Sequence, residues 1–372
     1  MVKKIVLVLL FIGTVIACSS DDGDNGGGGP TDPVDNFDRG AMLTNLADNV
    51  IVPAFNDFSA KMTALKTAGT SFTAMPNQAN LNALRTAWYD AYKTYQKVEM
   101  FNIGKAEELG YNYFMNIYPV TVADIEDNVA NGGYDLDHPN NHDAQGFPSL
   151  DYLLYGVGAD DTAILAKYTS DTNANGYKMY VSDVLNQMES KTSEVVADWN
   201  GSYRDLFVAS TGNTATSSVN KFVNDFIYYY EKGLRANKFG IPAGVFSPTT
   251  LPEKVEAYYS DDISKELSLI ALQAVQDIFV GRYYGINATG ESFHTYLVYL
   301  QRSDISNAIT SQLSDAETEV NPLMDSFYDQ VMNDNAKMTM AYDELQKAVV
   351  LLKVDMLQAF NINVDYIDAD GD

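Results

Sequence analysis

Apolar residues recur three or four positions apart over most of the chain after Phe37, which is the spacing of a helix with one buried face. Two such faces come first: Leu43, Leu46, Val50, Phe55, Phe58, Met62 and Leu65, and then Leu81, Leu84, Trp88, Tyr92, Tyr95 and Val98. Pro53 interrupts the first pattern and predicts a kink or break, because proline has no backbone N–H. Residues 67–80 contain the breakers Gly69 and Pro76 and are predicted to connect the two helices.

Further segments along the chain show the same helical character. They are residues 120–128, 149–155, 176–198, 217–237, 252–284, 293–300, 304–315, 321–333 and 337–360. Strand-type alternation is scarce, and only the last residues from Ile362 look extended. The pattern therefore predicts an all-α chain built from bundle-like packings.

Two long segments separate predicted helices, residues 128–147 and 239–252. Loops of this length inside a compact helical domain are usually functional or disordered. The second segment also lies between two halves of comparable length, so we expect a domain boundary near 199–217 or near 239–252.

The first residues carry the features of an export signal. Lys3 and Lys4 precede an apolar stretch, and the signal peptide is predicted to cover residues 1–17. The run Val15-Ile16-Ala17-Cys18 resembles the lipobox of bacterial lipoproteins, which implies acylation of Cys18 and a lipid anchor in the membrane. Residues 18–36 read as a flexible acidic linker, whose start resembles a surface-export signal. The alternative is an ordinary cleaved signal peptide. Both interpretations predict a protein of the cell envelope, and the resemblance to a lipobox favours an outer-membrane lipoprotein.

The formal net charge of −26 and the pI near 4.3 argue against a nucleic-acid partner, because such binding depends on Lys and Arg at phosphates. Cationic ligands are compatible with this charge, and so is an acidic, well-solvated surface with no ligand. Cys18 is the single cysteine, so the chain has no internal disulfide to stabilise it.

Two of the three histidines, His138 and His142, lie among the carboxylates Asp135, Asp137 and Asp143. Their spacing of four would place both rings on one side of a helix, as in helical zinc motifs. However, Pro139 disfavours helical geometry at His138, which places the pair in a loop. The cluster is therefore either a metal site or an exposed polar loop.

Six segments resemble, in order, conserved blocks of the imelysin-like family. They are RTAWYDAYKTYQKVEMFNIG with Trp88 and Glu99, IYPVTVADIED with Tyr118, GFPSLDYLLYG, YYEKGLRANKFGIPAG, PEKVEAYYSDD and LLKVDMLQAFNINVDYIDADGD. The resemblance implies two four-helix-bundle-like domains packed side by side with a cleft between them. Residues 37–210 would form the domain with the GFPSLD motif, and residues 211–372 the second domain.

The family signature is Gly-x-His-x-x-Glu, associated with zinc in peptidase members, and here it falls on residues 146–151. Gly146 is kept and Asp151 replaces the glutamate, but Pro148 stands in place of the histidine and has no ring nitrogen to bind a metal. Pro148 and Asp151 also suit the first turn of a helix, which explains them without a ligand. The resemblance implies a binding cleft lined by Gly146, Phe147, Pro148, Asp151, Glu99, Trp88 and Tyr118, with Asp151, Glu99, His138 and His142 as metal candidates.

Members of the family are associated with bacterial iron uptake, so the resemblance, together with the missing histidine and the predicted cell-envelope location, implies a non-catalytic binding component of iron or haem acquisition. The expected ligands are iron, haem or another divalent metal, and the expected partners are the membrane, an iron or haem source and an outer-membrane transporter. One alternative is a divergent metallopeptidase that uses His138, His142 and Asp151. The other is a surface module that binds a protein or glycan without metal.

Overall fold

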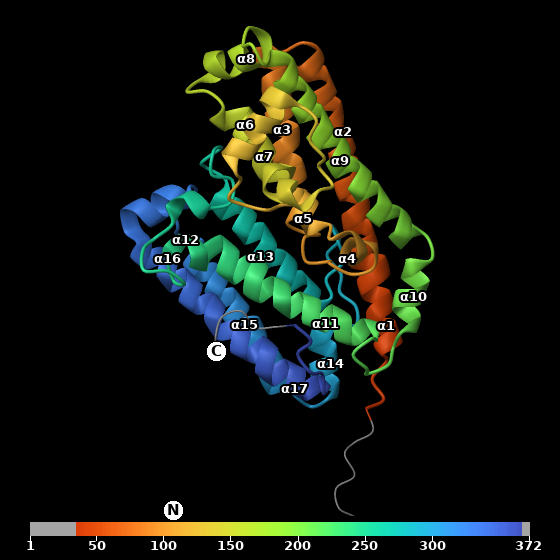
Figure 1. Ribbon diagram of the computed structural model, residues 1–372. Helices are drawn as coiled ribbons and strands as arrows, with labels where there is room; N and C mark the ends of the chain where they lie inside the picture. Colours follow the sequence, from red (N-terminus) through yellow and green to blue (C-terminus); the bar gives the residue numbers. More distant parts are fainter. Residues whose placement is uncertain (1–34, 367–372) are drawn as a thin grey trace, which may run out of the picture. The chain divides into compact units, whose positions relative to one another are not determined.

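The computed structural model describes residues 35–366, and every regular element in this part of the chain is a helix (Figure 1). One isolated β-bridge, between Arg282 and Thr289, is the nearest approach to a sheet within these residues. The prediction of an all-α chain is confirmed. The predicted signal peptide, the acylated Cys18 and most of the 18–36 linker lie outside the described residues.

The helices of the first half are α1 (Arg39–Asn45), η1 (Leu46–Ile51), α2 (Val52–Ala74), α3 (Gln78–Tyr95), α4 (Lys105–Leu109), α5 (Asn112–Met115), α6 (Val122–Asn131), η2 (Pro139–Ala144), α7 (Gly146–Asp151), η3 (Tyr152–Gly156), α8 (Asp161–Thr169), α9 (Ala174–Asn200) and α10 (Tyr203–Ala209).

Those of the second half are α11 (Ser218–Tyr228), η4 (Tyr229–Gly240), α12 (Ile241–Ala243), η5 (Pro252–Lys254), α13 (Ser264–Val280), α14 (Phe293–Tyr299), α15 (Ser303–Val320), α16 (Phe327–Val350), η6 (Leu351–Met356) and α17 (Leu357–Phe360). Of the η elements, η2 and η5 are 3-10 helices and the others are π-helical.

Pro53 does not break the helix, so of the predicted kink or break the break is wrong. The helix passes through it from the π-helical η1 into α2. Proline cannot donate to the carbonyl four residues earlier, which belongs to Asn49. That carbonyl instead accepts a bond from the backbone N–H of Tyr284, at 2.8 Å. Tyr284, from a distant part of the chain, therefore supplies the hydrogen bond that Pro53 cannot donate to the Asn49 carbonyl.

Two other predicted boundaries are wrong for reasons of packing. Helix α2 continues through Gly69, where a Cβ would lie 2.1 Å from a methyl carbon of Leu185, so the missing side chain lets α9 approach closely. The predicted helix 252–284 begins only at Ser264, because Ala257 and Asp261 have positive φ angles and the backbone between them turns. The boundary predicted between the helices 321–333 and 337–360 is confirmed, because α16 is kinked at Asp334, whose φ of −152° and ψ of 70° are non-helical.

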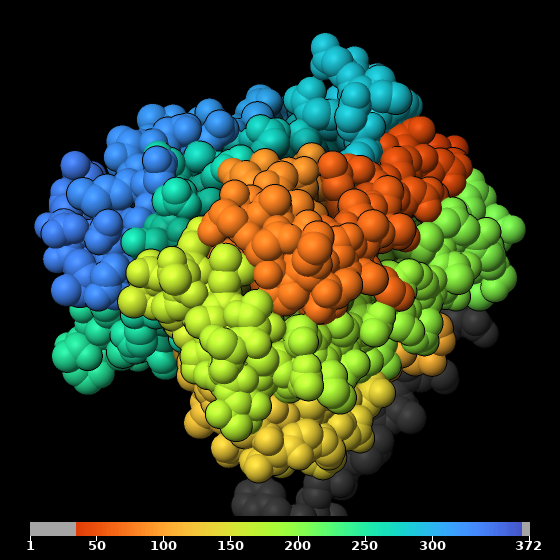
Figure 2. All heavy atoms as spheres, turned by 90° about the horizontal axis from the view of Figure 1, so that it is seen from above, coloured from red at the N-terminus to blue at the C-terminus, as the bar shows by residue number. Residues whose placement is uncertain are grey.

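Helix α2 packs along both α3 and α9, and α13, α15, α16 and η4 pack together in the second half (Figure 1). In Figure 2 the orange atoms of the first half adjoin teal atoms of the second, in agreement with the contact between α3 and α13.

The described residues from Phe37 onward form one compact unit. The division into two domains at residue 210 stays a prediction. None of the helices between residues 35 and 366 has the length and apolar character that a membrane crossing requires.

Phe58 of α2 provides a test of this packing. Its fully buried ring lies 5.5 Å from that of Tyr95 and 6.3 Å from that of Phe147, measured between centroids. The variant Phe58→Ala should lower the free energy of unfolding by about 3–5 kcal/mol, because it leaves a cavity between three elements. Urea denaturation measures this, with the exposed Thr63→Ala on the same helix as the control, expected to change it by less than about 0.5 kcal/mol. An equal effect of both substitutions would contradict the packing.

Candidate functional site

Three residues of the predicted cleft are core residues. The indole N–H of Trp88 donates to the carbonyl of Phe147 at 3.1 Å, and the Phe147 ring stacks on Tyr92 with centroids 4.5 Å apart. Both side chains are fully buried. Gly146 has a φ of +78°, and a Cβ there would lie 2.3 Å from the carbonyl oxygen of Met115. Gly146, Phe147 and Trp88 therefore position α7 against α3 and α5, and they do not line a cleft.

Asp151 ends α7 in a buried, hydrogen-bonded position. One carboxylate oxygen accepts from the backbone N–H of Tyr259 at 2.8 Å, and the other accepts from that of Ser260 at 2.9 Å. Burial raises the pKa of Asp151 to about 7, even though these hydrogen bonds act to lower it. Asp151, Pro148 and Tyr118 line one cavity of about 450 Å³. The structure therefore brings together three of the predicted residues.

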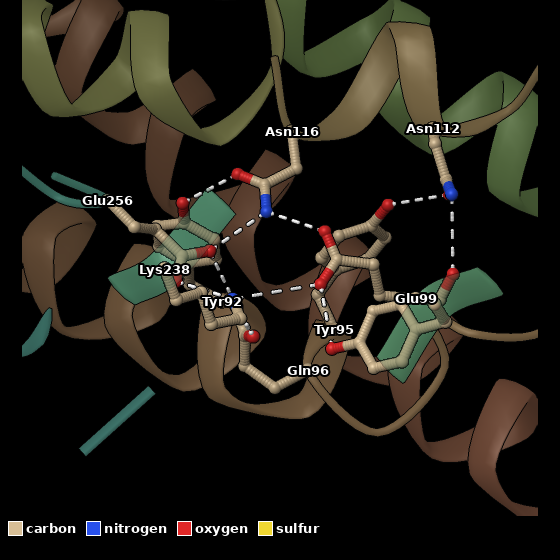
Figure 3. Close-up of polar contacts among 9 residues, drawn as sticks. Tyr92, Tyr95, Gln96, Glu99, Asn112, Asn116, Lys238 and Glu256 are labelled. Atoms are coloured by element: carbon tan, nitrogen blue, oxygen red, sulfur yellow. Dashed lines mark hydrogen bonds and ion pairs between the residues drawn. The ribbon is translucent and has the colours of Figure 1, made fainter. Parts of the chain in front are cut away.

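A buried lysine lies close to the carboxylates of two glutamates. The Lys238 ammonium contacts Glu256 Oε2 at 2.6 Å, Gln96 Oε1 at 2.7 Å and Glu99 Oε2 at 3.7 Å (Figure 3). Lys238 and Glu256 are 1% and 2% exposed, and Gln96 is fully buried. Buried charges persist only where their partners compensate for lost hydration, so this arrangement is a built polar centre.

Asn116 joins the two glutamates (Figure 3). Its amide donates to Glu99 Oε1 at 2.7 Å and to Glu256 Oε1 at 2.8 Å, while its own oxygen accepts from the Tyr92 hydroxyl at 2.6 Å. The Tyr229 hydroxyl donates to Glu99 Oε2 at 3.0 Å. Each carboxylate oxygen of the two glutamates therefore has a partner. We refer to Gln96, Glu99, Asn116, Lys238 and Glu256 as the Glu99 network.

The electrostatics of the Glu99 network follow from its burial. Burial raises the pKa of Glu99, Lys238 acts in the opposite direction, and the nearby Glu256 raises it further. Burial also raises the pKa of Tyr92 and Tyr229 well above the usual value, so both stay neutral hydrogen-bond donors. A carboxyl with a raised pKa, Glu99, and two phenols with strongly raised pKa values, all gathered near one buried cation, mark a candidate functional site.

The network joins four separate segments of the chain. Gln96 and Glu99 follow α3, Asn116 caps the C-terminus of α5, Lys238 lies on η4, and Glu256 follows η5. The π-helical η4 is twelve residues long and also carries Tyr229. Such wide helical turns are rare and occur often at functional sites. Glu99 was predicted from the sequence and the other four residues were not, although Lys238 and Glu256 lie inside segments that resembled family blocks.

Glu99 opens onto a polar cavity of about 370 Å³, which we call the Glu99 cavity. Its walls include carboxylates, phenols, amides and a lysine, namely Glu99, Glu107, Asp225, Tyr113, Tyr228, Tyr229, Asn102, Asn112, Asn116, Asn237 and Lys232. Burial raises the pKa of Asp225 to about 8, and Glu107 and Asp365 raise it as well. The cavity therefore has an excess of acidic groups and would favour a cation.

Neither of the two predicted histidines lines the Glu99 cavity. His138 caps η2, where its Nδ1 accepts from the backbone N–H of Asn140 at 3.2 Å. The His142 ring stacks on Tyr113 at 4.9 Å and lines a different cavity of about 490 Å³ with Asp143. The predicted metal candidates His138, His142, Asp151 and Glu99 therefore do not line a common cavity. Within residues 35–366 no three His, Cys, Asp or Glu side chains form a group suited to a metal ion.

The donor chemistry at the signature does not fit a peptidase zinc. Such a centre needs three protein ligands and an open position for water. Pro148 offers no ligand atom, and both oxygens of Asp151 accept backbone hydrogen bonds. The acid of the altered signature instead attaches α7 to the turn at Tyr259 and Ser260.

Comparison with known proteins gives the family and the fold. The family model described as imelysin, a peptidase family, matches residues 51–355. An imelysin-like protein of known structure from Psychrobacter arcticum 273-4 superposes with a TM-score of 0.69 at 18% identity, covering 88% of this chain and 97% of that one. A structure from Parabacteroides distasonis ATCC 8503 has the same TM-score at 17% identity, covering 87% and 96%.

One curated relative shares a shorter segment. Iron-regulated protein A of Synechococcus elongatus is 32% identical over 85 residues, which are 22% of this chain and 24% of that protein. The match thus spans about a quarter of the relative's length.

The variant Lys238→Met tests the Glu99 network. Loss of the ammonium leaves two buried carboxylates without their counterion, and the free energy of unfolding should fall by about 3–5 kcal/mol. The control Lys347→Met removes an exposed lysine paired with Glu344 and should leave the free energy of unfolding nearly unchanged. Adding Glu256→Gln to Lys238→Met should recover part of the loss. A double variant that is no more stable than Lys238→Met would argue against the assigned charges.

Asp151 should impose a pH dependence on stability. Its folded-state pKa of about 7 lies above the unfolded value of about 3.9, so the folded state binds the proton more tightly. The free energy of unfolding must therefore fall as pH rises from about 4 to about 7. Relative to Asp151→Asn, which does not titrate, the wild type should lose roughly 2–3 kcal/mol between pH 5 and pH 8 in urea denaturation. Parallel pH profiles for the two proteins would refute this.

Proposed function

This chain belongs to the imelysin family, and from that premise we propose that it is a non-catalytic binding component of iron acquisition at the cell envelope. The observation that carries the proposal is the Glu99 network, a buried and fully hydrogen-bonded charge centre that opens onto a polar cavity. The name of the curated relative, Iron-regulated protein A, supports the link to iron.

The geometry favours binding over hydrolysis. A metal-dependent peptidase needs a carboxylate that is free to act as general base beside an open metal position. The carboxylates of Glu99, Glu256 and Asp151 are already engaged by amide, phenol, ammonium or backbone donors. Such groups suit a rigid recognition surface, because their orientation is set before the ligand arrives.

The ligand that best fits the Glu99 cavity is a small iron complex with positive charge on its surface. The carboxylates of Glu99, Glu107 and Asp225 are distributed over the cavity and do not converge on one point, which suits a molecule and not a bare ion. The phenols of Tyr113 and Tyr228 add flat contact area with polar tips. Haem, which carries two anionic propionates, fits this lining less well.

The proposed location at the cell envelope rests on the first residues of the sequence. A lipid on Cys18 would hold the protein at the outer membrane, and residues 18–36 would separate the domain from the lipid surface. An outer-membrane transporter is the natural partner for a protein that binds an iron complex there. Metabolic labelling with a fatty acid, compared between wild type and Cys18→Ser, tests the anchor. Equal labelling of both would exclude it.

Asp225→Asn is the sharpest test of the Glu99 cavity, because the Asp225 carboxyl lines the cavity without a hydrogen-bonding or ion-pairing partner among the described residues. The full-length protein is titrated with ferrioxamine B, an iron complex that carries a free ammonium, and with haemin. We expect ferrioxamine B to bind, and Asp225→Asn to weaken that binding about tenfold at pH 9. The control Asp315→Asn removes an exposed carboxylate on α15 and should leave affinity unchanged.

The same variant has a distinctive pH signature. Because Asp225 titrates near pH 8, wild-type affinity for the cationic complex should rise between pH 6.5 and pH 9, and the rise should shrink in Asp225→Asn. Failure of both iron compounds to bind would overturn the proposed function. Peptide cleavage that a chelator abolishes would also overturn it, in favour of a peptidase.

A further inference from the structure

A further cavity of about 310 Å³ lies where the two halves of the chain meet, and it shares no residue with the Glu99 cavity. Its walls come from η1 and α2, from the segment after α3, from one face of α13, from the loop after α13 and from the end of α15. We call it the α13 cavity. A concave site of this size between packed helices is typical of small-molecule binding.

The floor of the α13 cavity is apolar. Val50, Ala54 and Phe101 form one side and are at most 5% exposed. On the other side, Leu269 and Ile270 of α13 are only half-buried although both are fully apolar. An apolar ligand that removes such side chains from water lowers the free energy of the complex. The floor therefore favours the hydrocarbon part of a ligand.

The carboxylates at the rim are already paired. Asp277 accepts from Arg282 at 2.8 Å and from Gln273 at 2.9 Å. Glu317 accepts from the amide of Gln276 at 3.2 Å. Glu266 accepts from the Tyr89 hydroxyl, and the Lys93 ammonium lies 3.8 Å from it. Two of these three acids therefore have a cationic neighbour, Arg282 for Asp277 and Lys93 for Glu266.

Lys97 is the charged group at this rim that has neither an ion pair nor a hydrogen bond among the described residues, although its positive charge acts to lower the pKa of Asp277. Its ammonium lies 5.2 Å from the centre of the Tyr284 ring, a cation–π contact, and it makes no ion pair or hydrogen bond with any residue of the described part of the chain. A carboxylate or sulfonate placed at Lys97 would gain a charge-assisted hydrogen bond. Salt screens the charges elsewhere on this acidic protein beyond about 8–10 Å, so the negative charges that oppose an anion here are those of Glu266, Asp277 and Glu317 in the same lining.

We propose that the α13 cavity binds a small anionic amphiphile, with its hydrocarbon body against Leu269 and Ile270 and its acidic group at Lys97. A single-chain fatty carboxylate is the simplest molecule of this class. Binding there bridges α13 to the segment after α3, so the ligand contacts both halves of the chain. The proposal is independent of the iron-complex site.

Calorimetric titration of the full-length protein with decanoate tests this inference, with decanol and decyltrimethylammonium as uncharged and cationic analogues. Lys97→Gln should raise the Kd for decanoate about tenfold, the loss of about one charge-assisted hydrogen bond, and leave decanol unaffected. Ile270→Trp should fill the cavity and abolish binding of both. The matched control Lys61→Gln removes a lysine on α2 that does not line the cavity, and it should behave as wild type.

Three outcomes would overturn the inference. Decanoate could fail to bind, it could bind equally well to Lys97→Gln, or decyltrimethylammonium could bind more tightly than decanoate. Asp225→Asn should leave decanoate binding intact, and Lys97→Gln should leave ferrioxamine B binding intact. Failure at one cavity is thereby distinguished from failure at the other.

Discussion

The buried ammonium of Lys238 is the interaction on which the centre of the structure depends. It meets Gln96, Glu99 and Glu256, which come from segments far apart in the chain. Taking these charges out of water costs several kcal/mol for each ion, and only their mutual contacts offset that cost. The segments that carry them must therefore pack in one arrangement, and this constraint holds η4, the end of α3 and the turn after η5 together.

The turn after η5 links the Glu99 network to the altered signature. Its Glu256 side chain enters the network, while the backbone N–H groups of Tyr259 and Ser260 hold the carboxylate of Asp151. One short non-helical segment thus connects α7 to the Glu99 network. In a zinc peptidase the acid of the signature would serve chemistry, whereas here it fixes the position of a helix. Pro148, which stands where the resemblance predicts a histidine, is consistent with that structural use.

The helical architecture was largely predictable, and the errors have local physical causes. The spacing of apolar residues predicted the apolar faces of α2 and α3, because a helix that buries one face has apolar residues three or four positions apart. It could not foresee that Gly69 would admit Leu185 inside a continuous helix, or that Tyr284 would satisfy the carbonyl opposite Pro53. Both outcomes depend on residues more than a hundred positions away. The same limit explains why residues 255–263 were wrongly predicted to be helical.

By itself the sequence determined the helical class and the resemblance to the family signature, with Pro148 at the position of its histidine. It also identified Glu99 and Asp151 as candidate site residues. These depend on residue type and short-range spacing, which a sequence displays directly. Only the tertiary structure decided that Gly146, Phe147 and Trp88 are core residues, that Glu99 and Asp151 line different cavities, and that Lys238 and Glu256 complete the site. The physical reason is that burial and charge pairing are properties of segments brought together from distant parts of the chain, and no local pattern encodes which distant partner a charged side chain will meet.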